Sequence, residues 1–502
     1  WTFDAAGAVC GGAEIAPAAV APLLLRLVDQ SLVHTSVGPG DGGRYRLLEM
    51  VREYVADRLE ASGEAEAVRQ RHAEYYLALA EEAEPALAGA DQAIALGRLE
   101  AEQANLRAAL AWYLRYDAQA GLRLAGLLWR LWRIRGHLSE GRAWLERLLA
   151  AAPAPTVHRA KALLGTGVLA GDQGELGRSA DWYAASLSLY RQLDDQPGVA
   201  LTSYYLGNLV VAQGETGQAR VLLETSLELS RRLGDSWTSM GALAGLGDLA
   251  RHQARYDEAR ERYAASLALA RASGEEWYEA WLLGELGNVA RIQADFPRAH
   301  RLLQESLAGF RRLRDASRIA NVRKHLGHLA AAQGDLDEAQ ARYEASLAGA
   351  EASKDRLQAG IVLGDLGNLA RRRGDDAEAV RRWHACLTIL RRFEDHHWCL
   401  SWSLSNVGML VIQRRAYRQG VRFLGAAAAA YPDCLLALDP DERDDGAARL
   451  AESRAAMGEA AFAEAWAEGR ALPRSQAFAD ALGLLTQFVN RAAQPPGDAP
   501  LG

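Results

Sequence analysis

The sequence predicts an all-α protein, built as a solenoid of antiparallel helix pairs and preceded by a small module that holds a short β-hairpin. Three observations support this prediction. A sequence register recurs every forty residues, and Pro197 and Pro297 are the only prolines between residues 156 and 431. A glycine-rich turn also separates two short strand-like segments near the N-terminus. The first two observations indicate uninterrupted helical packing, and the third indicates a hairpin.

The N-terminal segment is expected to form the hairpin module. An apolar helix over residues 19–27 leads into residues 31–34, and a glycine-rich turn then connects to residues 44–47. Two short strands around such a turn, followed by a helix over residues 49–59, look like the latter part of a winged-helix domain. A helix that reads DNA normally carries several basic or amide side chains, whereas residues 19–27 carry only Arg26. We therefore expect a packing module rather than a DNA contact.

The central part of the chain repeats a fixed set of positions. Glycine recurs at Gly167, Gly207, Gly247, Gly287, Gly327 and Gly367. Twelve residues after each glycine stands a small residue: Ser179, Ala219, Ala259, Ala299, Ala339 and Ala379. A large apolar residue follows four positions later, and a small residue three positions after that. Glycine lets two helices approach closely, and alternating small and large residues interlock, so the register predicts six stacked helix pairs.

The boundaries of the predicted parts follow from where this register holds. We expect a partial winged-helix domain (1–62), a helical linker with a degenerate repeat (63–155), the repeat array (156–395), degenerate C-terminal repeats with capping helices (396–485), and a disordered tail (486–502). Val407-Gly408 slips from the register by one position, as is typical of a terminal repeat that caps a solenoid.

The repeated positions resemble the tetratricopeptide repeat (TPR) family over about residues 157–395. Leu-Gly, alanine, a bulky residue and a small residue stand at the family's offsets. The period of forty residues is longer than the usual 34 of the family. Where the family has a late proline, this chain has arginine, at Arg231, Arg271, Arg311 and Arg391. The resemblance implies an α-solenoid whose first helices line a concave groove.

Several runs outside the array resemble a narrower family. Residues 44–54, 71–76, 99–112 and 462–470 are similar to bacterial STAND-class regulators, which are signal-transduction ATPases related to LuxR-type and antibiotic-regulatory activators. This resemblance implies that the chain is a non-catalytic sensor and protein-interaction arm of a transcriptional regulator. It also implies a partner, a nucleotide-binding domain upstream of Trp1 that binds ATP, so we expect the chain to be part of a longer protein. The alternative is a stand-alone TPR scaffold for protein partners.

Composition excludes several other classes of function. The net charge of -7 argues against direct nucleic-acid binding, which usually needs a basic surface. The only lysines are Lys161, Lys324 and Lys354, and none lies in a glycine-rich turn, so the chain has no phosphate-binding P-loop and we expect no cofactor in it. No stretch approaches the ~20 apolar residues that span a bilayer. We therefore expect a cytoplasmic protein that does not contact the membrane.

The candidate binding residues follow the Leu-Gly pairs. The residue after each pair is expected to point into the groove, which gives the positions Asn208, Asp248, Asn288, His328 and Asn368. Three residues later, on the same face, stand Arg251, Arg291 and Arg371. Asparagine amides can hold a peptide backbone, and arginine suits carboxylates or phosphates. The predicted ligand is a protein or peptide, or a small-molecule effector. The alternative is that these side chains only satisfy neighbouring backbone groups and solvate the surface.

Two further groups of residues could bind a flat ligand or a metal ion. Trp281 is expected to face the groove, where it could stack on a flat ligand, whereas the other tryptophans of the array are expected to lie in the core. A second group combines possible metal ligands: His384, Cys386, His396, His397 and Cys399. Cys386 occupies the small-residue position of the repeat, so packing already explains it. We expect no metal site.

Overall fold

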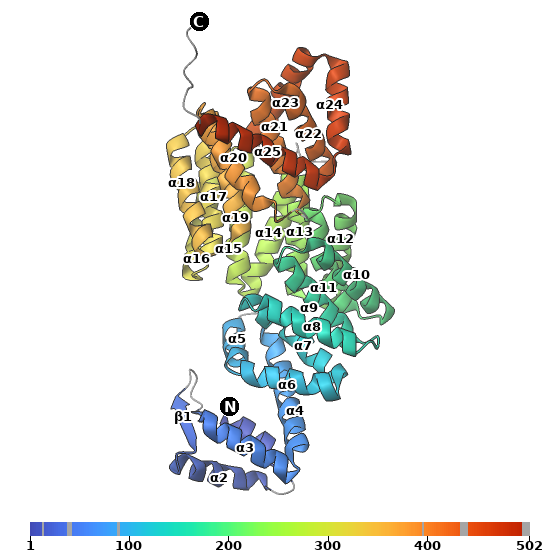
Figure 1. Cartoon of the computed structure of the whole chain (residues 1–502), viewed down its shortest axis with the longest axis vertical. Helices are drawn as coiled ribbons and strands as arrows, with labels where there is room; N and C mark the ends of the chain where they lie inside the picture. The colour runs from blue at the N-terminus through green and yellow to red at the C-terminus, as the bar shows by residue number, and fades with distance from the viewer. Residues whose placement is uncertain (13–14, 38–42, 88–90, 394–395, 432–439, 494–502) are drawn as a thin grey trace. The chain divides into compact units, whose positions relative to one another are not determined.

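The computed structural model describes residues 1–12, 15–37, 43–87, 91–393, 396–431 and 440–493. The only strands among these residues form one antiparallel hairpin, and nearly all the rest is helix (Figure 1), which confirms the predicted all-α fold. The chain divides into two compact units, residues 1–198 and 199–502, so the predicted array is split between them. None of the helices in the described ranges combines the length and the apolar character needed to cross a bilayer.

Unit 1 contains the hairpin module and a set of helices that ends with the first helix pair of the array. Its elements are α1 (Phe3–Cys10), α2 (Pro17–Asp29), β1 (Val33–Val37), β2 (Gly43–Leu47), α3 (Glu49–Ser62), α4 (Ala65–Ala83), η1 (Glu84–Leu87), α5 (Gln92–Ala101), α6 (Gln103–Tyr116), α7 (Ala118–Ile134), α8 (Leu138–Ala151), α9 (Val157–Asp172) and α10 (Leu176–Gln192). The next helix, α11 (Gln196–Ala212), begins in unit 1 and continues into unit 2.

The hairpin module has its own small core. Strands β1 and β2 pair antiparallel, with Val33 opposite Leu47, and Val33 is buried together with Val20 and Leu24 of α2. The predicted helix at residues 19–27, the two strands and the following helix are all present as α2, β1, β2 and α3. Most of the glycine-rich turn lies outside the described residues. The winged-helix character of the module remains a prediction.

A buried carboxylate ties this hairpin to the helices that follow it. Glu102 is 4% exposed and accepts hydrogen bonds from Arg44 of β2 (2.6 Å), Tyr76 of α4 (3.1 Å) and Asn105 of α6 (2.6 Å). All four residues lie in or next to the runs that carry the resemblance to STAND-class regulators. Because a buried charge needs partners, this network fixes the hairpin against α4 and α6.

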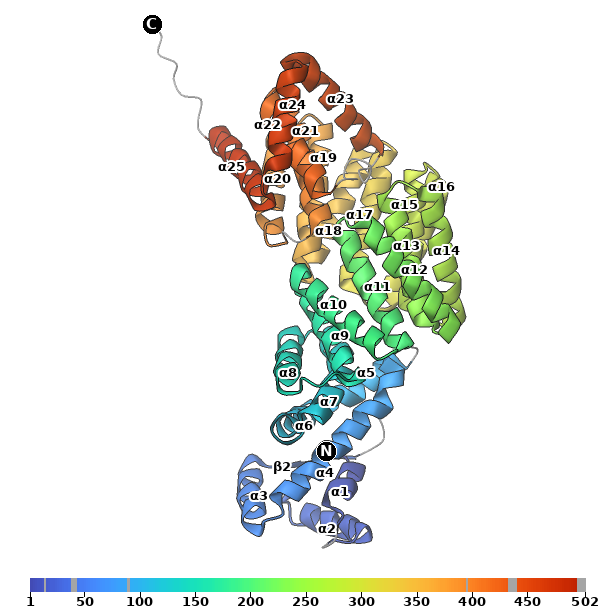
Figure 2. The same cartoon turned by 90° about the vertical axis from the view of Figure 1, so that its right-hand side faces the viewer.

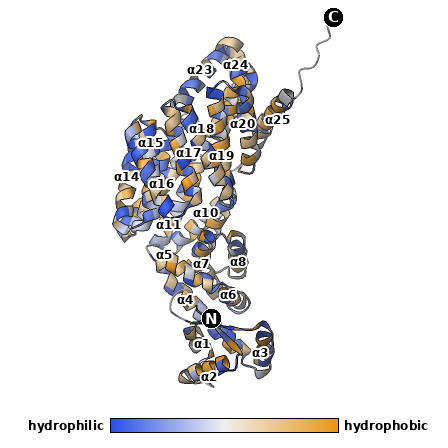
Figure 3. Ribbon diagram, turned by 90° about the vertical axis from the view of Figure 1, so that its left-hand side faces the viewer, coloured by the Kyte–Doolittle hydropathy of each residue, from blue (hydrophilic) through white to orange (hydrophobic). Residues whose placement is uncertain are grey.

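Unit 2 contains the remaining helix pairs of the array and a C-terminal helical cap. Its elements after α11 are α12 (Thr216–Leu233), α13 (Ser236–His252), α14 (Tyr256–Ser273), α15 (Glu276–Ile292), α16 (Phe296–Arg312), α17 (Ala316–Ala332), α18 (Leu336–Ala352), α19 (Arg356–Arg372), α20 (Asp376–Leu390), α21 (His397–Gln413), α22 (Tyr417–Ala430), α23 (Pro440–Met457), α24 (Glu459–Ala471) and α25 (Arg474–Ala493). Figure 3 shows that hydrophilic residues prevail on α14, α15 and α16 on the side facing the viewer.

The forty-spaced glycines lie at the helix contacts for which the sequence predicts them. In every pair, a Cβ atom added to the glycine would meet the bulky residue sixteen positions later in the second helix, at 2.6–2.8 Å. The pairs are Gly167 with Tyr183, Gly207 with Leu223, Gly247 with Tyr263, Gly287 with Leu303, Gly327 with Tyr343, and Gly367 with Trp383. Real Cβ atoms essentially never come so close, so this position requires glycine. The predicted stacking of helix pairs is confirmed.

In four of the six repeats, the small residue has a second role that its size alone did not indicate. Ser186, Ser266, Ser306 and Ser346 each donate a hydrogen bond to a backbone carbonyl twenty-six residues earlier, at 2.6–2.9 Å. Each of these serines is fully buried. The carbonyl belongs to the first helix of the same pair, so the bond fixes the register of the two helices.

Two tight turns per repeat adopt a left-handed conformation. The first turn has a positive φ at Gly174, Gly214, Ala254, Ala294, Gly334 and Gly374, and the second at Asp194, Gly234, Gly274, Arg314 and Lys354. Both sets keep the forty-residue spacing. Glycine is the residue that adopts this conformation at least cost, and the alanine, aspartate, arginine and lysine positions accept it under strain.

The C-terminal cap differs from its prediction at one end. A buried cluster joins α20, α21, α22 and α25, with Trp383, Leu404, Leu424 and Leu485 essentially fully buried. Helix α25 continues to Ala493. The predicted tail over residues 486–502 is therefore wrong for its first eight residues, because Leu485 anchors α25 in the cluster; residues 494–502 lie outside the described part of the chain.

Candidate ligand-binding face

The first helices of the pairs form one continuous layer of unit 2. Helix α15 contacts α17, α17 contacts α19, and α19 contacts α21, in addition to the contacts within each pair. We use the term inner face for the surface of α13, α15, α17 and α19 that carries the predicted binding positions. These positions lie on successive helices, as the forty-residue register predicts.

The α13 part of the inner face holds a charged group of residues. Arg251 lies 3.7 Å from Asp248 and 3.9 Å from Glu285 of α15. The Tyr263 hydroxyl donates a 2.7 Å hydrogen bond to Asp248. Burial raises the pKa of Asp248 and of Glu285, and the charge of Arg251 opposes both shifts. The group therefore links neighbouring helix pairs through one largely buried guanidinium.

The middle of the inner face continues this pattern with new partners. Arg291 donates two hydrogen bonds to the Asn288 side chain, at 2.9 and 3.2 Å, and both residues are 6% exposed. His328 of α17 lies 3.1 Å from Asp365 of α19. Most of the predicted positions thus contact other side chains on the inner face, which agrees in part with the interpretation that they satisfy their neighbours.

Helix α19 carries a row of buried polar side chains, each with one atom that lacks a hydrogen-bond partner. The unpartnered atoms are Gln358 Nε2, Asp365 Oδ2, Asn368 Oδ1 and Arg371 Nε. The other polar end of each side chain is engaged by Asn321, His328, Glu442 and Asp445, respectively. An unpaired buried polar atom is costly, so these four side chains are candidates for contact with a polar ligand.

A buried lysine lies on the neighbouring helix. Lys324 of α17 is only 9% exposed, and none of the residues that the structure describes forms an ion pair with it. Burial lowers the pKa of Lys324, and the negative charges of Asp365 and Glu285 oppose that shift. A buried ammonium without an ion-pair partner is destabilising, and a carboxylate-bearing ligand would relieve the cost.

Two buried histidines border this surface. His252 accepts or donates a 3.1 Å hydrogen bond with the Tyr431 hydroxyl, and burial followed by the charge of Arg251 lowers its pKa well below the ordinary value. His325 of α17 is 7% exposed, and burial together with the charge of Lys324 likewise lowers its pKa. Both imidazoles are therefore neutral at physiological pH.

The remaining two predicted binding residues have packing roles. Asn208 of α11 lies against Gly245 of α13, where a Cβ atom would come within 2.3 Å of its amide oxygen. Trp281 is half-buried and stacks on Trp277 with 6.3 Å between ring centroids. It packs in the apolar clusters that join neighbouring helix pairs. Its predicted stacking on a ligand remains a prediction.

The residues weighed as metal ligands have other partners. His384 contacts the Thr486 hydroxyl at 3.1 Å, and His397 contacts the backbone oxygen of Gln213 at 2.7 Å. Cys386 and Cys399 are buried free thiols whose pKa burial raises. Within the described ranges, no three His, Cys, Asp or Glu side chains converge on a point where a metal ion would fit.

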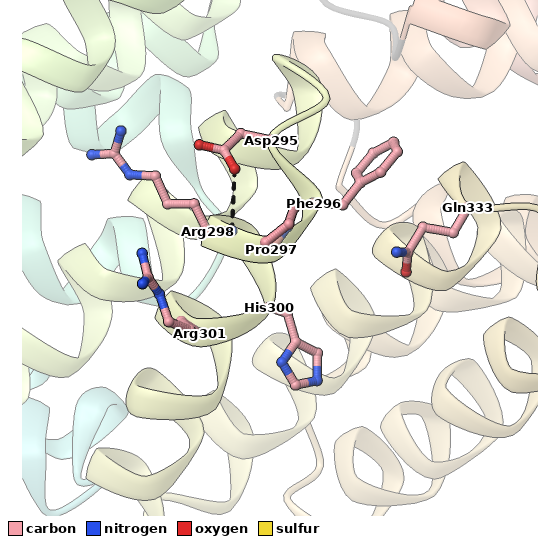
Figure 4. Close-up of a pocket in the computed structure, with 7 residues that line it drawn as sticks. All are labelled: Asp295, Phe296, Pro297, Arg298, His300, Arg301 and Gln333. Carbon is pink, nitrogen blue, oxygen red and sulfur yellow. Dashed lines mark hydrogen bonds between the residues drawn. The ribbon is translucent and has the colours of Figure 1, made fainter.

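A shallow hollow lies elsewhere, at the start of α16. Its volume is about 570 Å³, and it is lined by Asp295, Phe296, Pro297, Arg298, His300, Arg301 and Gln333 (Figure 4). Arg298 and Arg301 extend to one side, whereas His300 and Gln333 lie on the other. None of these residues belongs to the predicted binding positions. The hollow is lined mostly by exposed side chains of a second helix, so it offers no buried recognition group.

Sequence reasoning missed the residues that stand two positions before the repeat glycine. Glu285, His325 and Asp365 occupy this place, directly before a Leu-Gly pair, and all of them contribute to the inner face. The available signal was a column of ionisable residues in a helix that is otherwise apolar. The sequence predicted a concave groove and gave no sign that Glu442 and Asp445 of α23 contact the inner face at α19.

Comparisons with known proteins agree with the repeat architecture. The tetratricopeptide repeat family matches residues 239–312 and 318–392. Proteins of Mycobacterium tuberculosis and Mycobacterium bovis that are named as candidate HTH-type transcriptional regulators are 41% identical over 150 residues, which is 29% of this chain. The match covers 17% of the length of those relatives, so the chain spans only a small part of them.

Solved structures align with this chain at low sequence identity. A STAND protein with a tetratricopeptide repeat sensor from Pyrococcus horikoshii has a TM-score of 0.49 and 13% identity, over 93% of this chain and 63% of that one. Aspartyl phosphate phosphatase F from Bacillus subtilis has a TM-score of 0.47 and 11% identity, over 67% and 92%. Residues 239–312 and 318–392 thus match the tetratricopeptide repeat family, and the chain resembles bacterial HTH-type transcriptional regulators over 150 of its residues.

Proposed function

We propose that the inner face binds a peptide segment of a partner protein, and that the chain is the sensor and interaction arm of a STAND-type transcriptional regulator. The observation that carries this proposal is the row of buried polar side chains on α19, each with one atom that lacks a hydrogen-bond partner. Beside them lies Lys324, which is 9% exposed and forms no ion pair with the residues that the structure describes. Polypeptide backbone supplies the alternating donors and acceptors that such atoms lack. The role is binding and not catalysis, and ATP belongs to a nucleotide-binding domain outside this chain.

The regulator part of the proposal rests on the shared sequence with HTH-type regulators and on the repeats themselves. A solenoid changes curvature through small adjustments at many helix contacts, so a ligand that bridges several first helices favours one curvature. In the full protein, such a change would alter the packing of this arm against the nucleotide-binding domain.

A peptide selection tests the proposal. Random twelve-residue peptides displayed on phage are selected on the full chain, and the affinity of each selected peptide is measured by fluorescence anisotropy. The double variant Arg251→Ala with Arg291→Ala should weaken binding at least tenfold, because both guanidiniums lie on the inner face. The matched control is Arg342→Ala with Arg381→Ala, which removes two arginines from the exposed second helices α18 and α20. Equal affinities in both variants, or no enrichment of any peptide, would contradict the proposal.

A further inference from the structure

Helix α23 occupies one end of the inner face with two acidic side chains. Glu442 accepts a hydrogen bond from the Asn368 amide, and Asp445 accepts one from the Arg371 guanidinium, each at 2.5 Å. The two acidic residues are three positions apart on α23, and their partners are three positions apart on α19. Since residues three apart lie on one side of a helix, the two pairs form a matched contact between the helices. Figure 2 shows α23 extending from beside α24 toward the array.

The receiving surface on α19 is built from buried recognition groups. Asn368 is 6% exposed, and the Arg371 side chain is 8% exposed. Each also keeps a second buried polar atom without a partner, Oδ1 of Asn368 and Nε of Arg371. A guanidinium normally engages a carboxylate through two parallel hydrogen bonds, so α23 satisfies this surface only in part.

A third contact joins the same turn of α23 to a second helix of the array. Arg443 donates a 2.9 Å hydrogen bond to the Tyr256 hydroxyl at the start of α14. The N-terminal turn of α23 therefore spans two different helix pairs. Polar contacts of Glu442, Arg443 and Asp445 therefore fix this turn against the repeats.

Apolar packing holds α23 through half-buried side chains among the described residues, Leu450 and Met457, which pack against the clusters of the C-terminal cap. Between Glu442 and Met457, only Gly446 and Ser453 are buried, whereas the neighbouring α22 buries Gly420 and seven further residues. The contacts of α23 with α21, α22 and α24 involve mostly half-buried or exposed side chains. Most helices of a folded protein are stabilised by an apolar face, so α23 depends unusually strongly on its polar contacts.

From these observations we propose that α23 is an internal ligand of the inner face, and that the partner segment is an acidic helix that takes its place. This inference rests on the proposed function and names the chemistry of the partner. The partner carries two carboxylates three positions apart, as Glu442 and Asp445 do, which bind Asn368 and Arg371. It completes the second hydrogen bond of Arg371 that α23 leaves unmade, and it competes with α23 for the surface.

Hydrogen exchange of the full chain tests the internal contact. In the double variant Glu442→Gln with Asp445→Asn, amide exchange in residues 442–457 should become at least tenfold faster, because the charge-assisted bonds are lost. The control Asp444→Asn removes a neighbouring carboxylate that is exposed. It should exchange at the wild-type rate. Unchanged exchange in the double variant, or equal acceleration in the control, overturns the proposal.

Binding in trans tests the acidic partner. The probe is a fluorescein-labelled synthetic peptide with the sequence of residues 440–457. In the wild-type chain, α23 is tethered and present at high effective concentration, so it competes with the peptide. The peptide should bind the variant carrying Glu442→Gln and Asp445→Asn at least tenfold more tightly than the wild type, and adding Arg371→Ala should abolish this gain. Equal affinity for wild type and double variant, or a gain that Arg371→Ala leaves intact, overturns the proposal.

The two hypotheses fail in different ways. If the inner face binds no polypeptide, neither the phage-selected peptides nor the labelled probe bind in a manner that depends on inner-face arginines. If the inner face binds peptides but α23 is not its internal ligand, the selected peptides still lose affinity in the variant with Arg251→Ala and Arg291→Ala. Their affinity is then the same whether or not Glu442 and Asp445 are substituted.

Discussion

The close approach of paired helices predicts a sharp penalty for adding one methyl group. In Gly247→Ala, the new Cβ would lie 2.6 Å from Cε1 and 2.7 Å from Cδ1 of Tyr263. Tyr263 is completely buried, and its hydroxyl donates a 2.7 Å hydrogen bond to Asp248. The ring therefore cannot move away without loss of this bond or displacement of the neighbouring helix.

The size of the effect follows from three contributions. Overpacking a core costs about 1–3 kcal/mol, and loss of a hydrogen bond to a carboxylate costs about 1.5–3 kcal/mol. Replacing glycine with alanine inside a helix returns about 1 kcal/mol. Gly247→Ala should therefore lower the free energy of unfolding by about 1.5–5 kcal/mol.

Urea unfolding followed by circular dichroism measures this change. The matched control is Gly483→Ala in α25, where the glycine is exposed and a Cβ atom would meet nothing within 4 Å. This control should gain about 0.5–1 kcal/mol from helix propensity alone. If Gly247→Ala also stabilises the protein, or changes it by less than about 0.5 kcal/mol, the argument from close helix approach is refuted.

Three other predictions follow from local features. Ala294 has a φ of 60°, so Ala294→Gly should raise the urea midpoint and increase the free energy of unfolding by about 0.5–1 kcal/mol. Gly334→Ala at the equivalent position, where φ is 83°, should lower the midpoint. The opposite order would contradict backbone strain at Ala294. Glu102→Ala should destabilise unit 1 by about 3–5 kcal/mol in thermal unfolding, whereas exposed Glu100→Ala should cost less than about 1 kcal/mol; similar losses would refute the buried network. Because the pKa of His252 is lowered in the native chain, the unfolded chain binds a proton below pH ~6.5 that the native chain does not. The free energy of unfolding therefore decreases as the pH is lowered, and His252→Gln should remove about 1 kcal/mol of the loss between pH ~6.5 and ~5.5.

The fold could be predicted from the sequence to a large extent because the repeated residues are those that pack the two helices of each pair together. A glycine that must accept a bulky residue sixteen positions later, such as Gly367 with Trp383, recurs at every helix pair. The serine hydrogen bonds, such as that of Ser306, were not predicted, because a small side chain is required for packing whether or not it carries a hydroxyl. The extent of α25 was also missed, since Leu485 is buried by helices distant in sequence.

The candidate site could be predicted only by position and not by contacts. The register places Asp248, Asn288 and Asn368 at the same position of a first helix, and these helices are α13, α15 and α19 in the structure. Their partners depend on tertiary contacts between helix pairs, as with Arg251 and Glu285, or on the C-terminal cap, as with Asn368 and Glu442. Asn368 and Glu442 are seventy-four positions apart, and the sequence between them carries no local signal of the contact.

The claim that the inner face binds peptides is tested most directly by hydrogen exchange of the full chain, measured with and without a saturating phage-selected peptide. The account predicts that the peptide slows exchange in the first helices α13, α15, α17 and α19, and leaves the second helices α14, α16, α18 and α20 unchanged. Protection confined to the second helices, or no protection at saturation, would contradict it.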